Sequence, residues 1–294
     1  MFNKRQPPGL VWIKGRITRV NKQRYHIADL IYLMARLRDP NTGCPWDLAQ
    51  DYASIVPHTL EEAYEVAAAI ERGDFDNLRE ELGDLLFQVI FYTQIAAEEE
   101  RFDFSGVLDS LVEKLVIRHP HVFPEGDLRG KRRNPQDDPS EQKIKTHWED
   151  QKQKDRLAKG QKRRLADIPL ALPALSRSQK LQKRAANHDF DWENINQVVG
   201  KLDEETDELK EAIRSGDRNA IEDELGDLIF VCVNLARHAG LDAEAALRRS
   251  NRKFESRFDS METLCQARGQ VFESLSAEQK NALWEEAKHI EKQS

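Results

Sequence analysis

The sequence predicts an all-α fold built from a tandem duplication. Apolar residues recur every three or four positions along most of the chain, as in Leu30, Met34 and Leu37, whereas alternating strand-like runs are scarce. A set of acidic residues occurs twice with the same internal spacing. At 294 residues, the chain is long enough for two domains of ordinary size, each with its own core.

Two helices in each half are expected to carry the duplicated acids. The first copy consists of Glu61, Glu62, Glu65, Glu81 and Asp84. The second copy consists of Glu204, Glu205, Glu208, Glu224 and Asp227. Acids about one turn apart project from neighbouring points of a helix, and an antiparallel pair of such helices brings four of them together. Gly73-Asp74 and Gly216-Asp217 predict the short turn between the two helices of each pair.

Crowded carboxylates repel each other unless a cation holds them. Each half is therefore predicted to be a helical bundle with a metal-binding antiparallel helix pair plus additional helices. Oxygen ligands alone favour a hard ion, Mg²⁺ or alternatively Mn²⁺, over zinc or copper, and Mg²⁺ commonly binds substrate phosphates as well. A di-iron bundle would need Glu-x-x-His on two helices, but the pair Glu286 and His289 is not repeated in the first copy.

A purely structural explanation of the acids competes with metal binding. Glu-rich helices often carry solvated ion pairs, and Glu62 could close a capping box with Thr59. The capping pattern is not repeated in the second copy, where Leu202 replaces Thr59 although all the acids persist.

The second acidic helix of each copy, residues 82–97 and 225–236, is apolar on nearly every face of a helical projection. Such a helix is predicted to lie inside a bundle. Asp84 and Asp227 would then be buried, and an unpaired buried carboxylate costs several kcal/mol or becomes protonated.

The remaining residues suggest four segments: an N-terminal extension at 1–24, a first repeat core at 25–118, a linker with a peripheral helix carrying Trp148 at 119–174, and a second repeat at 175–294. No apolar run is long enough for a bilayer, and three scattered cysteines fit a reducing compartment, so a cytoplasmic protein without a membrane partner is expected. The net charge of −7 argues against nucleic acid as a partner. The basic residues within 129–184 leave an unknown protein partner open.

The ordered blocks of both copies resemble the MazG family of nucleoside triphosphate pyrophosphohydrolases. In the second copy these blocks are Glu204-Glu205-x-x-Glu208, Glu224-Leu225-Gly226-Asp227, Lys253-x-x-x-Arg257 and Trp284. The first copy adds Cys44-Pro45-Trp46-Asp47 before its acids and Arg118-His119-Pro120-His121 after them. The resemblance covers residues 25–292. It implies an all-α, Mg²⁺-dependent homodimer that cleaves nucleoside triphosphates between the α and β phosphates, releasing a monophosphate and pyrophosphate.

The resemblance also implies roles for individual residues of the second copy. The implied metal ligands are Glu205, Glu208, Glu224 and Asp227. The implied nucleotide contacts are Lys201, Leu202, Asp203, Glu204, Glu205, Asp227, Lys253, Phe254, Glu255, Ser256, Arg257 and Trp284. The first copy retains a second candidate metal site in Glu62, Glu65, Glu81 and Asp84. His58 stands in the place of Lys201 and removes a fixed positive charge, so the second copy is predicted to be the active one.

Two hypotheses for the function follow. In the first, Glu204 or Glu205 is the catalytic carboxylate that orients or deprotonates the attacking water. Broad base specificity is expected, because Trp284 could stack on any base, although the same residue could simply belong to the core. In the second, the protein is a non-catalytic, nucleotide-responsive module that binds a partner protein. The products formed from a triphosphate and Mg²⁺ distinguish the two.

Overall fold

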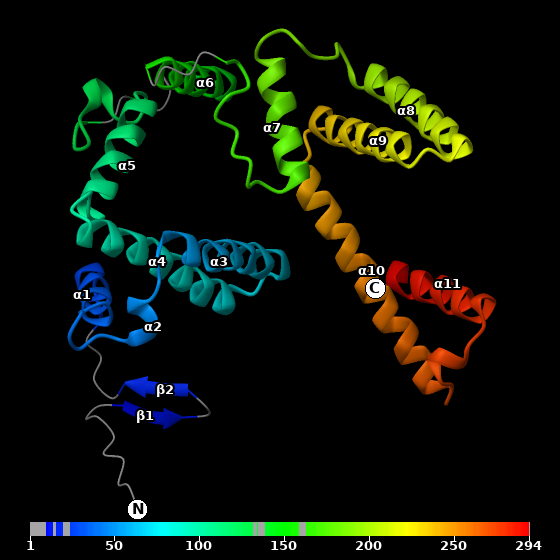
Figure 1. The fold of residues 1–294 in the computed structure, drawn as a ribbon, viewed down its shortest axis with the longest axis horizontal. Coiled ribbons are helices and arrows are strands. Elements are labelled where there is room, and N and C mark those ends of the chain that lie inside the picture. The colour runs from blue at the N-terminus through cyan, green and yellow to red at the C-terminus, as the bar shows by residue number, and fades with distance from the viewer. Residues whose placement is uncertain are drawn as a thin grey trace, which may run out of the picture. The chain divides into compact units, whose positions relative to one another are not determined.

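The acids of each half lie on a pair of antiparallel helices joined by a tight turn. In the computed structural model, the first pair is α3 (Tyr52–Arg72) with α4 (Phe75–Glu98), and the second is α8 (Ile195–Ser215) with α9 (Arg218–His238) (Figure 1). Gly73 and Gly216 end the first helix of each pair with φ of 68° and 73°, a conformation that favours glycine. Asp74 and Asp217 then cap the second helix, as the repeated Gly-Asp pair predicts.

The structure describes residues 10–13, 16–19, 24–131, 134, 139–158 and 163–293. The chain divides into two units, Met1–Gln151 and Lys152–Ser294. Each unit contains one of the acidic helix pairs, so the duplication seen in the sequence is also a duplication of structure. Helices dominate the described residues of both units, which confirms the all-α prediction.

The first unit builds its core on one side of α4. Helices α1 (Ile27–Leu37) and α5 (Phe104–Arg118) pack against α4. Met34, Ile55, Ile90, Phe91 and Ile95 form the buried cluster. The shorter helix α2 (Pro45–Leu48) and the 3-10 turn η1 (Pro124–Gly126) also belong to the first unit, and α6 (Glu141–Ala158) runs across the boundary between the units.

Arg38 holds three segments of the first unit together. Arg38 is the first residue after α1. Its side chain is only 7% exposed and donates to the carbonyl oxygens of Asp47 (2.5 Å) and Gln50 (3.1 Å). The same guanidinium pairs with Glu98 at the end of α4, at 2.8 Å. Hydrogen bonds from Arg38 and Gln94 outweigh the effect of burial and lower the pKa of Glu98.

The N-terminal extension contains a β-hairpin that the sequence analysis did not predict. Strands β1 (Leu10–Ile13) and β2 (Arg16–Arg19) pair antiparallel, with Leu10 opposite Arg19 and Trp12 opposite Ile17. They are the only strands among the residues that the structure describes. Each is four residues long, too short for strand periodicity to stand out against the helical pattern of the rest of the chain.

The second unit contains two helix pairs. Helix α7 (Ala174–Ala186) packs on α9 and on α10 (Ala243–Ala267), and α11 (Ala277–Gln293) packs along α10 after the 3-10 turn η3 (Phe272–Ser274) (Figure 1). Met261, Cys265, Leu283 and Ala287 form the buried cluster between α10 and α11. The acids of the second repeat therefore lie on α8 and α9, whereas Phe254, Arg257 and Trp284, called the aromatic block below, lie on α10 and α11.

Helices α4 and α9, which the sequence predicts to lie inside a bundle, each leave an apolar stripe exposed in the single chain. Leu82, Leu86 and Val89 of α4 are 50%, 39% and 37% exposed. Leu225 and Ile229 of α9 are each 45% exposed, and Cys232 is exposed as well. These six residues occupy equivalent positions of the two repeats and are called the exposed stripe below. The reason is geometric: a single packed layer covers only one side of a helix.

None of the helices among the described residues is long and apolar enough to cross a lipid bilayer.

Candidate metal and nucleotide site

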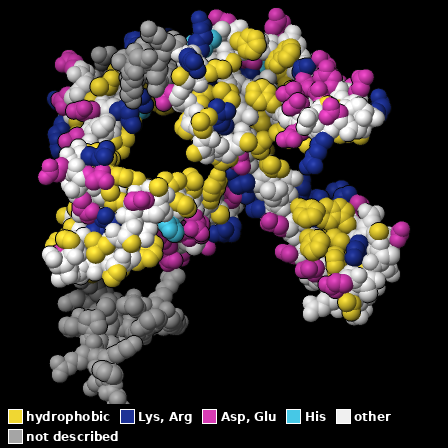
Figure 2. Space-filling model, in the orientation of Figure 1, with side chains coloured by type: hydrophobic (Ala, Val, Ile, Leu, Met, Phe, Trp, Pro, Cys, Tyr) yellow, Lys and Arg dark blue, Asp and Glu magenta, His cyan; other side chains and the backbone are white. Residues whose placement is uncertain are grey.

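Three acids of each repeat come together where the paired helices face each other. Glu205 of α8 and Glu224 and Asp227 of α9 can each offer one oxygen such that all three oxygens lie within 4.8 Å of one another. Glu62, Glu81 and Asp84 do the same in the first repeat. Figure 2 shows acidic side chains gathered over the α8–α9 pair. The spacing of the acids along the chain thus translates into convergence in space.

The fourth acid of each set, Glu208 or Glu65, stands beside these groups of three. Burial and then the charges of Glu208, Glu205 and Asp227 raise the pKa of Glu224. In the first repeat, burial and the charge of Asp84 are the main causes that raise the pKa of Glu62. Raised pKa values mean that burial and repulsion between neighbouring carboxylates disfavour the ionised forms. A divalent cation would offset this repulsion.

Burial of the acids differs from the sequence-based expectation. Glu205 is only 5% exposed, and Glu224, Glu62 and Glu81 are half-buried. Asp84 and Asp227 are exposed, so the expectation that both are buried is wrong for the single chain. At about 100° per residue, both aspartates lie nearly opposite the exposed stripe, on the side of their helix that faces the paired helix. Their oxygens nevertheless remain close enough to the glutamates to share one ion.

Lys201 distinguishes the second repeat from the first. Its Nζ lies 2.7 Å from Oε1 of Glu205 and 2.9 Å from Oε1 of Glu204. Hydrogen bonds to Glu205 and Glu204 raise the pKa of Lys201, so the ammonium is permanently charged at neutral pH. In the first repeat, Nδ1 of His58 lies 3.8 Å from Oε2 of Glu61.

The capping-box explanation of the acids is ruled out by the start of α3. This helix begins seven residues before Thr59, and Asp51 caps it by accepting a hydrogen bond from the Ser54 backbone N–H at 2.8 Å. The Thr59 hydroxyl instead donates to the Ile55 carbonyl at 3.1 Å and contacts the Tyr92 hydroxyl at 2.9 Å. Glu62 therefore lies in the middle of α3, where its side chain cannot cap the N-terminus of the helix.

The aromatic block lies on α10 and α11. The Trp284 ring centroid is 5.3 Å from that of Phe254, and the Arg257 guanidinium lies 5.5 Å above the Trp284 ring. Phe258 packs against the α10–α11 core, whereas Phe254 is 57% exposed, so only one of the two rings is enclosed.

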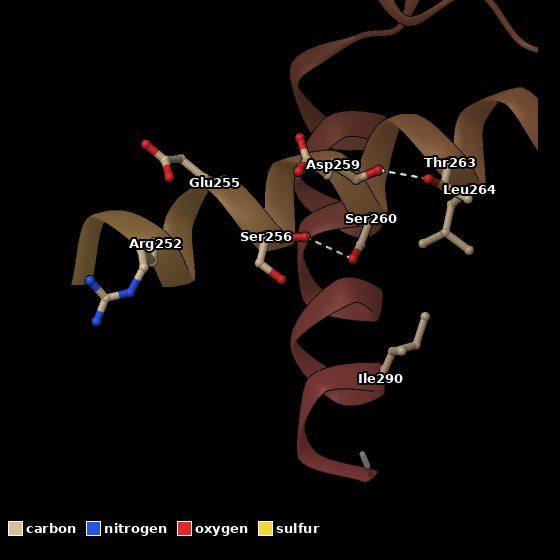
Figure 3. Close-up of a pocket in the computed structure, with 8 residues that line it drawn as sticks. All are labelled: Arg252, Glu255, Ser256, Asp259, Ser260, Thr263, Leu264 and Ile290. Atoms are coloured by element: carbon tan, nitrogen blue, oxygen red, sulfur yellow. Dashed lines mark hydrogen bonds between the residues drawn. The ribbon is translucent and has the colours of Figure 1, made fainter. Parts of the chain in front are cut away.

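The remaining predicted nucleotide contacts are spread over two helices. Glu255 and Ser256 line an open groove of about 600 Å³ beside Ile290 of α11 (Figure 3). Lys253 is exposed on the same helix. Leu202 is half-buried and Asp203 exposed on α8. The structure thus gathers the predicted nucleotide residues into one group on α8–α9 and another on α10–α11.

The first repeat has a comparable aromatic contact. The Trp148 indole N–H donates to the Arg118 carbonyl at 2.8 Å, and the His119 ring lies 5.2 Å from the Trp148 ring.

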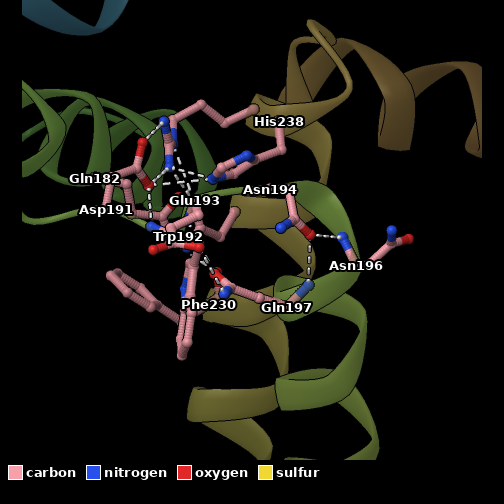
Figure 4. A network of polar contacts seen from close by, with 11 residues as sticks. Gln182, Asp191, Trp192, Glu193, Asn194, Asn196, Gln197, Phe230 and His238 are labelled. Atoms are coloured by element: carbon pink, nitrogen blue, oxygen red, sulfur yellow. Dashed lines mark hydrogen bonds and ion pairs between the residues drawn. The ribbon is translucent and has the colours of Figure 1, made fainter.

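A polar network beside the second acidic pair was missed by the sequence analysis. Asp191 accepts hydrogen bonds from Arg237, one of them at 3.0 Å, and contacts Nε2 of His238 at 3.1 Å (Figure 4). Gln182 of α7 donates to the Phe230 carbonyl of α9 at 2.8 Å. Two adjacent basic residues, Arg237 and His238, end α9 and indicate an acidic partner. That partner, Asp191, lies 46 residues before Arg237, so the sequence does not identify it. The network fixes the loop before α8 to the end of α9.

Comparison with known proteins agrees with this duplicated architecture. The description "MazG nucleotide pyrophosphohydrolase domain" matches residues 50–123 and again residues 194–261. A protein of Escherichia coli named nucleoside triphosphate pyrophosphohydrolase is 47% identical over 264 residues, which cover 89% of this chain and 97% of that relative. A Thermotoga maritima protein named nucleoside triphosphate pyrophosphohydrolase/pyrophosphatase MazG is 41% identical over 262 residues, which cover 88% of this chain and 94% of that relative. With two domain matches and relatives of this identity along most of its length, the chain belongs to the MazG family.

Proposed function

We propose that this protein hydrolyses nucleoside triphosphates between the α and β phosphates and releases a nucleoside monophosphate and pyrophosphate. The main support for this proposal is that one carboxylate oxygen each of Glu205, Glu224 and Asp227 lie within 4.8 Å of one another, beside the charged Lys201. The names of the relatives from Escherichia coli and Thermotoga maritima support the same reaction class.

The donor set fits Mg²⁺ or Mn²⁺, because it consists of carboxylate oxygens without cysteine or histidine. Glu205, Glu208, Glu224 and Asp227 would hold the ion. A bound ion of this kind would supply positive charge to the substrate phosphates and a coordinated water of lowered pKa. The acids of the first repeat offer a second ion site of the same composition.

The chain's own residues supply the other requirements of the reaction. Glu204 lies outside the group of three converging acids and pairs with Lys201, so we assign it to orienting the attacking water or accepting its proton rather than to metal binding, with Glu205 as the alternative. Lys201, Lys253 and Arg257 neutralise phosphate oxygens. Trp284 offers a ring face to the base, and stacking of this kind tolerates different bases.

A homodimer would cover the exposed stripe. The stripe recurs at equivalent positions of α4 and α9, on the side of each helix away from the acids, and exposed apolar surface of this kind marks protein interfaces. A helix pair from a second chain would cover the stripe and turn two helices into a four-helix bundle.

Product analysis tests the proposed reaction. Each nucleoside triphosphate is incubated with the purified protein and Mg²⁺, and the products are separated. Monophosphate and pyrophosphate in equal amounts, lost on chelation of the metal, are expected. Diphosphate with orthophosphate would contradict cleavage at the α,β bond, and unchanged nucleotide would favour the alternative of a non-catalytic, nucleotide-responsive binding module. A preference above about a thousandfold for one base would contradict recognition by stacking alone.

Matched substitutions in the two repeats test which one is active. Asp227→Asn and Glu224→Gln are expected to abolish pyrophosphate release, whereas Asp84→Asn and Glu81→Gln at the equivalent positions should retain most of it. Both pairs remove the same charges from the same helix positions, so a general effect on folding would appear in both. Near-normal turnover in Asp227→Asn would contradict the assignment of the active site to the second repeat.

A further inference from the structure

Glu291 makes the closest ionic contact of Arg257 that the structure describes. Oε2 of Glu291 lies 2.6 Å from both Nε and Nη2 of Arg257, so one oxygen accepts from one edge of the guanidinium. The Arg257 side chain is 18% exposed and Glu291 is 40% exposed. Trp284 lies two helical turns before Glu291 on α11, and its ring packs 5.5 Å from the guanidinium carbon. An acid and an aromatic ring of the same helix thus hold Arg257 from two sides.

This arrangement leaves part of the guanidinium unused by Glu291. A guanidinium has five N–H groups in a planar fork, and the Nε and Nη2 contacts of Glu291 involve only one edge of it. The Nη1 end can therefore receive an anion while Glu291 keeps its own contact. Holding the long Arg side chain in one rotamer beforehand reduces the entropy lost when a ligand binds.

We propose that Glu291 is a positioning residue that fixes Arg257 for a phosphate group of the substrate. This inference rests on the proposed function, because it requires a polyphosphate at Arg257. Glu291 itself does not touch the substrate. It acts by holding the Arg257 guanidinium in one position beside the Trp284 ring.

A matched ion pair on the same two helices provides the control. Nη2 of Arg268 lies 2.7 Å and 2.6 Å from the two carboxylate oxygens of Glu286. Glu286 is 39% exposed, nearly as much as Glu291, and also joins α11 to α10. Removal of either acid costs one α10–α11 ion pair, but only Glu291 contacts Arg257. The two variants therefore separate a structural role from a positioning role.

The test measures binding of a non-hydrolysable α,β-methylene triphosphate with Mg²⁺ by calorimetry, on the full chain. Glu291→Ala should weaken binding about tenfold, since one charge-assisted contact to phosphate is lost in most molecules. Glu291→Gln keeps an acceptor oxygen for Nε and should recover part of the affinity. Glu286→Ala should bind as the unmodified protein does. Arg257→Ala combined with Glu291→Ala should bind no more weakly than Arg257→Ala alone, because the acid acts through the arginine.

Three results obtained with the variants would overturn the inference. Equal affinities of Glu291→Ala and Glu286→Ala would reduce Glu291 to a structural contact. Tighter binding in Glu291→Ala would make it a competitor of the phosphate, and additive effects in the double variant would separate it from Arg257. Binding of the analogue without pyrophosphate release from a true triphosphate would instead contradict the proposed hydrolysis, and the affinities would still decide the role of Glu291. Absence of binding to the unmodified protein would overturn both.

Discussion

Nζ of Lys201 lies 2.7 Å from Oε1 of Glu205, whose side chain is only 6% exposed. This ion pair places a fixed positive charge inside the acidic group of the second repeat. The first repeat has His58 at the equivalent position, 3.8 Å from Glu61. In the proposed site, a lysine beside the candidate metal ligands would have two consequences: it would offset their mutual repulsion before a metal binds, and it would contact substrate phosphate afterwards.

Substitution Lys201→Met should destabilise the metal-free protein and make its stability more dependent on Mg²⁺. Without the ammonium, the buried Glu205 carboxylate loses its partner, at a cost of about 1 kcal/mol or more. Mg²⁺ can replace the lost charge, so the rise in Tm on adding Mg²⁺ should be larger in the variant than in the unmodified protein. Thermal unfolding with and without Mg²⁺ measures both quantities.

Lys210→Met is the matched control on the same helix. Lys210 pairs with Asp207 at 2.8 Å, but both side chains are largely exposed. Exposed pairs contribute little, so this variant should keep the Tm and the Mg²⁺ response of the unmodified protein. The same Mg²⁺ response in both variants would contradict a role for Lys201 in balancing the acids.

Substitution Ile229→Glu should convert the proposed homodimer into a monomer. Ile229 is 45% exposed in the middle of the stripe on α9, and a charge there would be buried without a partner in the dimer. Light scattering after size-exclusion chromatography gives the mass. Phe190→Glu serves as the control, since Phe190 is 82% exposed and lies outside the stripe. A dimer that survives Ile229→Glu would show that the interface lies elsewhere.

Substitution Arg38→Met should lower the free energy of unfolding of the first unit by about 3 kcal/mol. The buried guanidinium donates hydrogen bonds to the carbonyls of Asp47 and Gln50 and to the carboxylate of Glu98. All three acceptors lose their donor in the variant. Urea unfolding followed by far-UV circular dichroism measures the change.

Arg36→Met gives the comparison, because Arg36 is 55% exposed and lies 4.0 Å from Asp39. It should change the stability by less than about 0.5 kcal/mol. Similar losses in the two variants would mean that the Arg38 bonds contribute little.

The Asp191 carboxyl should make stability depend on pH on the acidic side. Burial opposes ionisation, but hydrogen bonds from Arg237 and His238 outweigh it and lower the pKa of Asp191. A carboxyl with a lowered folded-state pKa stabilises the protein above its unfolded-state pKa, and this contribution disappears as the pH falls through the folded-state pKa. Asp191→Asn should therefore cost about 1 kcal/mol at neutral pH and progressively less on acidification.

Urea midpoints recorded across the acidic pH range measure this difference. Asp189→Asn is a suitable control, because Asp189 belongs to the same loop and is outside the hydrogen bonds of the Arg237 network. A difference between Asp191→Asn and the unmodified protein that stays constant with pH would contradict the assignment.

The sequence alone determined the helices, the tight turns and the convergence of the acids, because each depends on spacing along a helix. Glu205 and Lys201 lie one turn apart, and Gly216 ends the helix that carries them, so local geometry suffices. The duplicated spacing then implied two such sites, and the coordinates agree.

Only the tertiary structure decided which side chains meet across long stretches of chain and which surfaces stay open. Arg38 and Glu98 are 60 residues apart, and Arg257 and Glu291 are 34 apart. Their pairing depends on how whole helices pack, which no local periodicity encodes. Exposure of Ile229 depends likewise on what covers α9, because hydrophobicity shows that a helix face needs a partner but not whether the same chain supplies it.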